Sequence, residues 1–399
     1  MDTVVVVGAS LAGHAMAQSL RREGFDGRLV VLGEEVHRPY DRPPLSKQFL
    51  TGRLEPGALA LEDPEEDLDV EWRLGSRAID LDVDRRTVRL ADDRTINADA
   101  VVVATGSRAR SLPGVAPRLR GVHYLRTLDD ALTLRQELVP GARLVVLGAG
   151  FIGSEVAATA AGMGLSVTVV EAALTPLAGP LGAQAGATVS SLHARHGVRV
   201  LCGTPVTGLV GGRRLQGVAL ADGRTLEADL VLVAIGSVPN TEWLAGSGLE
   251  ASLGLRCDSR GRAAAGIFGV GDCSAWFDPS LGQNLRIEHW TDSMQRAGIV
   301  AASMLRPEEE TKPLAAPYFW SDQYDVRIQY AGRRTGDEIF RLEHGSAEEE
   351  KLLGVYWRGQ DPMAVLALNQ PREFGRWRRR LVAPIAQPVL EPTKRKVEA

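Results

Sequence analysis

Two glycine-rich turns have the residue types and spacing of nucleotide-binding loops. One is Gly148-Ala149-Gly150-Phe151-Ile152-Gly153, a strict G-x-G-x-x-G motif. The other is Gly8-Ala9-Ser10-Leu11-Ala12-Gly13, in which Ser10 takes the place of the middle glycine. Such a turn lets the backbone approach a pyrophosphate, and the N-terminus of the following helix offers free N–H groups to the phosphates. The motifs predict two dinucleotide sites, although each could also be a packing turn between a strand and a helix.

An acidic side chain follows the second apolar run after each turn. These residues are Glu34 and Glu171. A carboxylate at this place accepts hydrogen bonds from ribose hydroxyls and repels the 2′-phosphate of NADPH. Residues 172–176 contain no Arg or Lys that could hold that phosphate. The second site is therefore predicted to take NADH, and two such sites in one chain indicate one tightly held and one exchanging cofactor.

The elements that must position these turns repeat along the chain. The patterns predict a strand, a helix and a strand over residues 3–7, 11–22 and 29–32, and again over residues 143–147, 151–161 and 167–170. Further apolar runs stop at turns that contain Ala104-Thr105-Gly106, Ile235-Gly236 and Gly271-Asp272. An aspartate in such a turn can bind sugar or ribityl hydroxyls. Beyond a charged stretch near residues 304–310 aromatic residues cluster, which predicts a third, α+β domain.

The composition excludes several other classes of protein. The chain has 46 Lys and Arg against 50 Asp and Glu, without the basic excess of a general nucleic-acid binder. Its three cysteines form no disulfide framework and lack metal-ligand spacing, so we expect no metal and a reducing, cytoplasmic setting. The first residues lack a basic n-region, so we expect no secretory signal, and no apolar run approaches the ~20 residues of a membrane span.

The ordered series of motifs resembles the FAD-dependent pyridine nucleotide-disulfide oxidoreductases. Within them it most resembles the NADH-dependent ferredoxin reductases that serve multicomponent oxygenases. The most specific stretches are residues 38–47 (Arg-Pro-Tyr-Asp-Arg-Pro-Pro-Leu-Ser-Lys), Glu288-His289-Trp290, and residues 317–324 (Pro-Tyr-Phe-Trp-Ser-Asp-Gln-Tyr). The resemblance implies an α/β fold with two nested, glutathione-reductase-like Rossmann domains for FAD and NAD, followed by the C-terminal domain. The expected boundaries are 1–113 with 241–311 for FAD, 114–240 for NAD, and 312–399.

The resemblance also implies roles for single residues. Glu34 and Arg42 would contact the adenosine part of FAD, and Asp272 its ribityl or pyrophosphate part. Lys47 would lie near flavin N5, ion-paired with Glu155, and these two are the expected catalytic residues. Trp290 and Trp320 would lie around the flavin ring. Taken singly, Lys47 could equally be a surface lysine and each tryptophan a core residue. The remaining predicted cofactor contacts come from the motifs above: Gly8, Ser10, Leu11, Ala12, Gly13, Ala104, Thr105, Gly106, Gly148, Gly150, Phe151, Ile152, Gly153, Glu171, Ile235, Gly236, Gly271, Glu288 and His289.

The cysteine positions indicate how electrons leave the flavin. Relatives that reduce disulfides or peroxides need a cysteine beside the flavin, but residues 40–47 contain none. We therefore expect an external acceptor, an acidic 2Fe-2S ferredoxin steered by the cluster Arg372, Arg376, Arg378, Arg379 and Arg380. The same cluster could be a solvated helix face. Alternatives for the whole chain are a rubredoxin or quinone reductase, or an NADH-sensing flavoprotein like apoptosis-inducing factor. We expect a monomer or a weak dimer.

Overall fold

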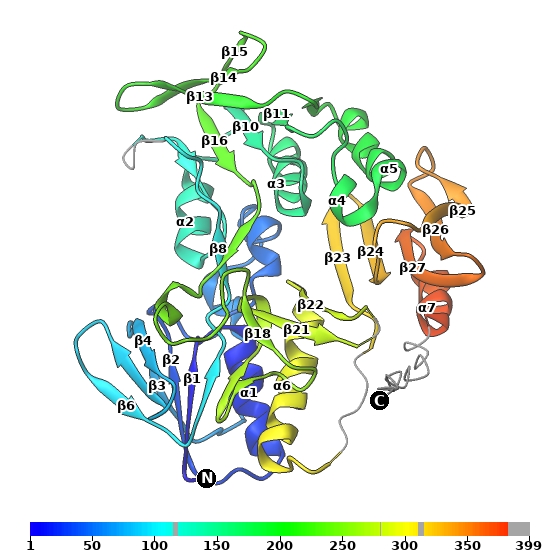
Figure 1. Ribbon diagram of the computed structural model, residues 1–399. Helices are drawn as coiled ribbons and strands as arrows, with labels where there is room; N and C mark the ends of the chain where they lie inside the picture. The colour runs from blue at the N-terminus through cyan, green and yellow to red at the C-terminus, as the bar shows by residue number, and fades with distance from the viewer. Residues whose placement is uncertain (115–118, 280, 310–314, 382–399) are drawn as a thin grey trace, which may run out of the picture.

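The computed structural model describes residues 1–114, 119–279, 281–309 and 315–381 (Figure 1). Its first large sheet draws strands from two distant parts of the chain, in the order β19-β20-β7-β1-β2-β3. The strands β1, β2, β3, β7 and β20 run parallel, and β19 is antiparallel at one edge. Parallel strands covered on both faces need continuous apolar runs, which explains the buried valines of Val4–Val7. The bounds are β1 Thr3–Val7, β2 Arg28–Leu32, β3 Val70–Arg73, β7 Ala100–Val103, β19 Arg262–Ala264 and β20 Ile267–Gly269.

The second large sheet repeats the parallel part of the first. Its order is β12-β11-β10-β16-β9, and all of its strands run parallel. Each unit also has a three-stranded antiparallel ribbon: β4-β5-β6 lies in the sequence between β3 and β7, and β13-β14-β15 lies between β12 and β16. The predicted internal repeat is therefore present in strands β1, β2, β3 and β7, which correspond to β10, β11, β12 and β16. The bounds are β9 Val122–His123, β10 Arg143–Leu147, β11 Ser166–Val170, β12 Arg199–Leu201, β16 Leu230–Val233, β4 Ala78–Asp82, β5 Thr87–Leu90, β6 Thr95–Asn97, β13 Val206–Gly211, β14 Leu215–Leu220 and β15 Thr225–Glu227.

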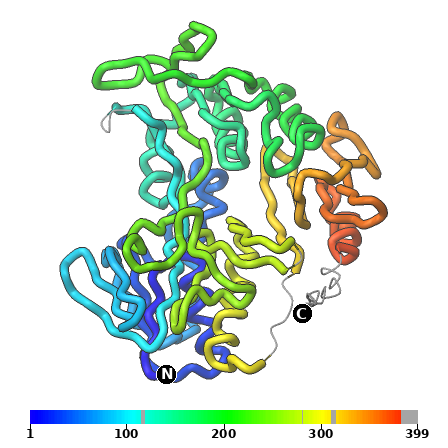
Figure 2. Tube along the Cα trace, in the orientation of Figure 1, coloured from blue at the N-terminus to red at the C-terminus, as the bar shows by residue number. Residues whose placement is uncertain are grey.

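The chain passes between the two units through a short two-stranded ribbon. Strand β8 (Ser107–Ala109) leaves the first unit and pairs antiparallel with β17 (Ser237–Pro239), which returns to it. After β17, the small sheet β18-β21-β22 and helix α6 complete the first unit. Helices α1 and α6 pack side by side although they lie far apart in sequence (Figure 2). Their bounds are α1 Leu11–Arg22, α6 Trp290–Leu305, β18 Leu255–Cys257, β21 Ser274–Asp278 and β22 Gln283–Arg286.

The remaining helices are short. Helix α3 (Phe151–Gly162) begins at the second glycine turn, and α2 (Leu128–Glu137) begins with a capping box between Thr127 and Asp130. The others are α4 Ala178–Leu181, α5 Ala183–Arg195, and the 3₁₀ turns η1 Pro43–Ser46, η2 Pro56–Leu59, η3 Glu242–Leu244 and η4 Gly271–Cys273. Among the described residues no helix has both the length and the apolar character needed to cross a membrane.

The C-terminal part forms an antiparallel sheet of its own in the order β23-β24-β27-β26-β25, with α7 packed on β24 and β27 (Figure 1). This confirms the predicted fold class of two nested α/β units and a C-terminal α+β domain. The expected boundary at residue 311 lies outside the described residues. The bounds are β23 Tyr318–Gln323, β24 Val326–Gly332, β25 Ile339–Ser346, β26 Lys351–Arg358, β27 Asp361–Leu368 and α7 Pro371–Arg380.

Close backbone contacts explain the glycines of the two motifs. A Cβ at Gly8 would lie 2.1 Å from the Ala104 oxygen, and one at Gly153 would lie 2.2 Å from the Gly148 oxygen. Gly150 differs, because a Cβ there would meet no heavy atom of the described residues within 4 Å. Steric contact within the fold therefore accounts for Gly153, whereas Gly150 keeps open the space in front of α3.

We expect Gly153→Ala and Gly150→Ala to separate these two roles. The first variant forces a methyl group against backbone and should lose about 1–3 kcal/mol of unfolding free energy. The second adds a methyl group in open space at an N-cap with ordinary φ and should lose less than about 1 kcal/mol. Urea unfolding followed by circular dichroism measures both. Equal losses would contradict the assignment.

Candidate functional site

The helix N-termini at the two glycine turns are open to an anion. Ser10 is the N-cap of α1 and Gly150 is the N-cap of α3, and neither caps its helix through a side chain within the described structure. The first-turn N–H groups are thus free to bind phosphate. At the first turn the Ser10 hydroxyl instead accepts a 3.1 Å hydrogen bond from Arg42 Nε.

A buried ion pair lies between the two units. Lys47 Nζ, just after η1, is 2.9 Å from Glu155 Oε2 on α3, and the two side chains are 11% and 4% exposed. The hydroxyl of Ser46 donates to the same oxygen, and Ser321 on β23 donates to Oε1 at 2.8 Å. This carboxylate of the second unit therefore receives donors from the first unit and from the C-terminal part, and it pairs with Lys47 as the family resemblance implies.

Further polar residues support this centre. Gln323 Nε2 donates to the Ser321 hydroxyl at 3.2 Å, and Thr159 donates to the Ser46 carbonyl at 2.9 Å. Sequence reasoning did not single out Ser46, Ser321, Gln323 or Thr159 as site residues. Three of them lie within the specific stretches 38–47 and 317–324, which was the available signal. Thr159 had no such signal, because it depends on which face of α3 meets η1.

The structure brings Arg42 to Glu35 rather than to Glu34. Arg42 Nη2 lies 2.6 Å from Glu35 Oε1, and Tyr40 donates a 2.5 Å hydrogen bond to the other oxygen. Glu34 is 69% exposed, and its carboxylate lies 3.6 Å from Arg77 Nε. Strand β2 ends at Leu32, so the position that corresponds to Glu171 is taken by Gly33, and Glu34 turns to solvent.

Glu171 itself is fixed in place. Its two carboxylate oxygens accept backbone hydrogen bonds from Ala149 and Ala173, each 2.8 Å long. The carboxylate is thereby held against the second glycine turn, where the ribose of a bound dinucleotide would lie. Ile152, in the same turn, is half exposed beside it.

The turns that close the first unit converge on Asp272. Its Oδ2 lies 2.6 Å from Arg126 Nη2 and accepts a 3.3 Å hydrogen bond from Ser107. A Cβ at Gly271 would lie 2.8 Å from the Ala12 Cβ, so η4 packs directly against the start of α1. Nearby, Thr105 donates to the Asn240 carbonyl at 2.6 Å, and the Gly236 carbonyl accepts from Arg110, which ties the two crossing segments together.

Aromatic rings cover the space between α6 and the C-terminal sheet. Trp290 lies with its ring centroid 6.4 Å from that of Trp320, and its Nε1 donates a 2.9 Å hydrogen bond to Asp41. Burial raises the pKa of that carboxyl group. The half-buried His289 ring lies with its centroid 5.0 Å from that of Phe319, and desolvation lowers its pKa to about 4, so the ring is neutral near pH 7. Phe319 in turn contacts Phe151 of the second glycine turn.

Glu288 is the remaining member of this group. Its carboxylate accepts a 2.5 Å hydrogen bond from Ser237 on β17 and pairs with Arg286. It therefore sits beside the crossing ribbon, at the edge of the space between the two units.

These residues fit two dinucleotide cofactors. Both helix N-termini present free N–H groups, and Gly150 leaves open space in front of α3. The Glu171 carboxylate is already held in the position where it would bind a ribose. FAD would lie along the α1 turn and Asp272, with its ring between Lys47 and the tryptophans. NADH would lie along the α3 turn and Glu171.

The cysteines are not placed for dithiol chemistry. All three are free, and Cys257 and Cys273 are fully buried. The Cys273 thiol donates to the carbonyls of Val103 and Val270, and burial raises its pKa, which disfavours the reactive thiolate.

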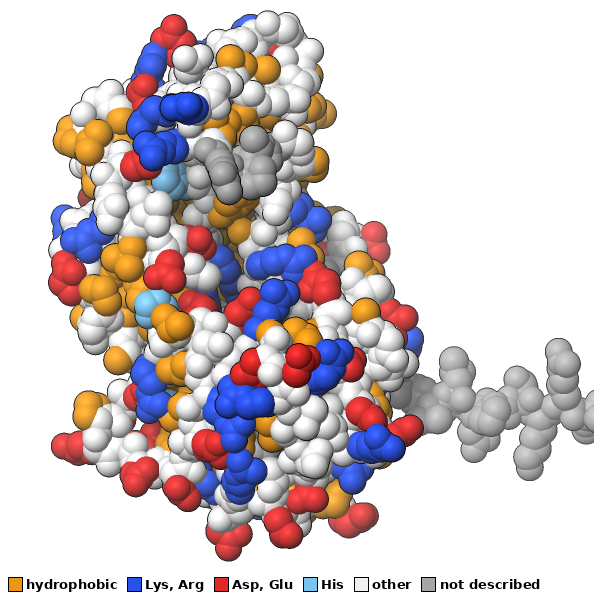
Figure 3. Space-filling view, turned by 90° about the vertical axis from the view of Figure 1, so that its left-hand side faces the viewer, with side chains coloured by type: hydrophobic (Ala, Val, Ile, Leu, Met, Phe, Trp, Pro, Cys, Tyr) orange, Lys and Arg blue, Asp and Glu red, His pale blue; other side chains and the backbone are white. Residues whose placement is uncertain are grey.

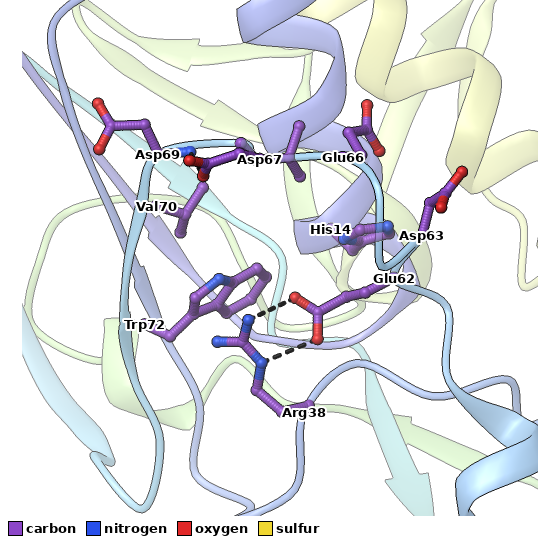
Figure 4. A pocket seen from close by; sticks show the side chains of 10 residues that line it. His14, Arg38, Glu62, Asp63, Glu66, Asp67, Asp69, Val70 and Trp72 are labelled. Atoms are coloured by element: carbon purple, nitrogen blue, oxygen red, sulfur yellow. Dashed lines mark hydrogen bonds and ion pairs between the residues drawn. The ribbon is translucent and has the colours of Figure 1, made fainter.

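A separate cavity of about 130 Å³ lies between α1 and the acidic loop before β3 (Figure 4). It is lined by His14, Trp72 and the Arg38–Glu62 ion pair, together with Asp63, Glu66, Asp67 and Asp69. None of these residues was predicted to bind a cofactor. Among the described residues no cluster of His, Cys, Asp and Glu is arranged to hold a metal.

Comparison with protein families gives two matches that cover most of the chain. Residues 2–297 match the model of the pyridine nucleotide-disulphide oxidoreductases, and residues 318–389 match a reductase C-terminal domain. The chain belongs to the pyridine nucleotide-disulphide oxidoreductase family. It is a member of that family without the active-site cysteines that the name suggests, since residues 40–47 have none.

Individual members of the family match over nearly the full length. The ferredoxin–NAD(+) reductase subunit of the benzene 1,2-dioxygenase system of Pseudomonas putida is 40% identical over 98% of this chain and 94% of its own. Putidaredoxin reductase from Pseudomonas putida is 34% identical over 94% of this chain and 90% of its own. A crystal structure of the covalent putidaredoxin reductase–putidaredoxin complex superposes with a TM-score of 0.92 at 32% identity, covering 96% of this chain and 94% of that one.

We expect Glu155→Gln to be much more damaging than Ser321→Ala in this oxidoreductase. Glutamine leaves the buried Lys47 ammonium without a charged partner, which should cost about 3–5 kcal/mol of unfolding free energy. Alanine at 321 removes one neutral donor and should cost about 1–3 kcal/mol. Chemical unfolding of both variants tests this order. A Glu155→Gln protein as stable as the parent would show that the ion pair does not hold the three parts together.

Proposed function

We propose that this chain carries electrons from NADH, through bound FAD, to a small iron–sulfur ferredoxin that serves an oxygenase. The observation that carries the proposal is the meeting of both nucleotide turns, Lys47–Glu155 and two tryptophans at one place without a cysteine. Relatives named as ferredoxin–NAD(+) reductases of dioxygenase systems match along almost the whole chain. The structural match to a reductase caught with its iron–sulfur partner supports the same acceptor class.

The two cofactors divide the chemistry. Bound FAD would accept two electrons from NADH and release them one at a time to the iron–sulfur centre. The chain's own residues hold the charges that this requires: Lys47 keeps an ammonium beside the ring site, and the buried carboxylate of Glu155 balances it. Trp290 and Trp320 place two aromatic rings beside the same space.

We further propose that the acidic ferredoxin docks near α7. Arg372, Arg376, Arg379 and Arg380 are exposed on this helix, and the guanidinium of Arg378 lies 4.5 Å from the Tyr318 ring, next in sequence to the site's aromatics. The opposite face of the molecule has basic and acidic side chains interspersed (Figure 3). A basic helix beside the predicted flavin ring suits an acidic partner better than a mixed face does.

The cytoplasm is the proposed location, because three free cysteines suit a reducing compartment and NADH is its soluble reductant. The proposed domain boundaries are 1–113 with 241–311, 114–240, and 312–399. The six-stranded sheet, the parallel five-stranded sheet and the C-terminal sheet each lie within one of these spans, which supports the boundaries.

Purified protein provides the direct test. The sample should be yellow, should release FAD on denaturation, and should bleach with NADH far faster than with NADPH. Cytochrome c should then be reduced quickly only when a 2Fe-2S ferredoxin is added. A colourless protein would overturn the cofactor assignment. A flavoprotein that bleaches but reduces no ferredoxin would favour the quinone-reductase or NADH-sensing alternatives.

We expect Glu171→Ser to reduce the preference for NADH over NADPH. Loss of the carboxylate removes hydrogen bonds to the ribose and the repulsion of a 2′-phosphate, and should shift the ratio of kcat/KM values by about tenfold to a hundredfold. Asp222→Asn, on the exposed β14–β15 turn of the same unit, is the matched control. An unchanged ratio in Glu171→Ser would argue that Glu171 only braces the glycine turn.

Removing positive charge from helix α7 should change the KM for ferredoxin and leave the reaction with NADH unchanged. We expect Arg372→Gln/Arg379→Gln to raise the KM for ferredoxin about threefold to tenfold at low salt and to flatten its salt dependence, with NADH-dependent bleaching unchanged. Arg213→Gln, on the distant β13–β14 turn, should leave both readouts unaltered. If the arginine variant keeps the parental KM at all salt concentrations, the partner docks elsewhere.

A further inference from the structure

Helix α6 carries a buried ion pair within its first two turns. Asp292 lies in the first turn, Arg296 follows one turn later, and Arg296 Nε is 2.6 Å from Asp292 Oδ2. The two side chains are 4% and 3% exposed. Buried charges are expensive, so a pair at this place needs an explanation beyond helix stability.

Several polar atoms of the pair lack hydrogen-bond partners among the described residues. The Nε–Oδ2 contact lacks the geometry of a hydrogen bond, and Arg296 Nη1 has no hydrogen-bond partner among the described residues. The guanidinium packs 4.7 Å from the Trp276 ring, which is itself fixed by a 2.8 Å bond from its Nε1 to the Gly269 carbonyl. Neither charge can move away to solvent.

Several other charged or titratable groups act on the pair from neighbouring elements. Asp272 on η4 and Arg333 after β24 act on Asp292, and Asp278 on β21, which pairs with Arg333 at 2.8 Å, acts on Arg296. Cys257 on β18 faces Arg296, and His289 at the helix start is neutral. Asp272 links this group directly to the proposed flavin site.

We propose that the charge balance between Asp292 and Arg296 controls the electrostatic potential at the N-terminus of α6, and through it the reduction potential of the flavin bound there. This inference rests on the proposed function. Neither residue is placed in contact with the cofactor, so both are positioning residues that act through the first turn of the helix. The positive end of a helix stabilises the negative charge of a reduced flavin, and a balanced pair behind it leaves that effect intact.

Removing one partner at a time unbalances the charge in opposite directions. In Asp292→Asn the Arg296 cation is uncompensated, which favours the reduced flavin and raises the potential. In Arg296→Gln the Asp292 carboxylate is uncompensated and lowers the potential, by a smaller amount because the buried carboxyl group can take up a proton. Burial already raises the pKa of Asp292 to about 6. The double variant Asp292→Asn/Arg296→Gln restores neutrality.

The experiment is an anaerobic titration of each holoprotein against a reference dye at pH 8. We expect Asp292→Asn to shift the ratio of reduced to oxidised flavin upward about threefold to tenfold, Arg296→Gln to shift it downward, and the double variant to return to the parental ratio. A tenfold change in this two-electron ratio corresponds to 29.6 mV. Asp222→Asn, which removes an exposed charge from the other unit, should leave the ratio unchanged.

Shifts below twofold in both single variants would overturn the inference while leaving the proposed function intact. A protein that binds no FAD would overturn the proposed function instead. If a single variant does not fold, the parent and the neutral double variant still decide the matter. As the pH falls from 7 to 5, Asp292 gains a proton in the parent and the potential should rise more steeply than in the double variant. Parallel curves would refute the inference.

Discussion

The carboxylate of Glu155 constrains the whole molecule. It is buried on the alanine-rich helix α3, whose side chains are mostly apolar. A buried charge is tolerated only when it is paired and hydrogen-bonded, and the donors here are Ser46 and Lys47 of the first unit and Ser321 of the C-terminal part, whereas Glu155 belongs to the second unit. The three parts must therefore dock in one arrangement for this carboxylate to be satisfied. The same arrangement brings both glycine turns and the aromatic residues of β23 and α6 to one place.

The two nucleotide units have one architecture and differ in how their openings are used. At the first turn, Arg42 reaches Ser10 and Glu35 and draws the segment before η1 over the start of α1. At the second turn, the space in front of Gly150 is free of the chain's own atoms within the described residues. A turn braced by contacts from a neighbouring segment suits a cofactor that stays, and a turn without such contacts suits one that exchanges. The difference arises outside the repeat itself, from the residues that follow β2.

Much of this could be predicted from the sequence. Continuous valine runs next to glycine motifs specify buried parallel strands and helix starts, so the repeat and its order follow from local pattern. The Lys47–Glu155 pair came from a resemblance and not from pattern. The contacts of Glu35, Arg126 and Ser321 could not be predicted, because they join residues that only the tertiary fold brings together. Glu34 and Glu35 are adjacent acids, and a shift of one residue at the end of β2 decides which one faces Arg42.

The β8–β17 crossing has a consequence for how the protein is made. The first large sheet takes four strands from residues 3–103 and two from residues 262–269, so the ribosome must synthesise the entire second unit before that sheet can close. The second unit has a continuous sequence and can fold as soon as it emerges. Until β20 is synthesised, the edge of β7 has no strand to pair with. During this interval the chain is most exposed to aggregation and to chaperones.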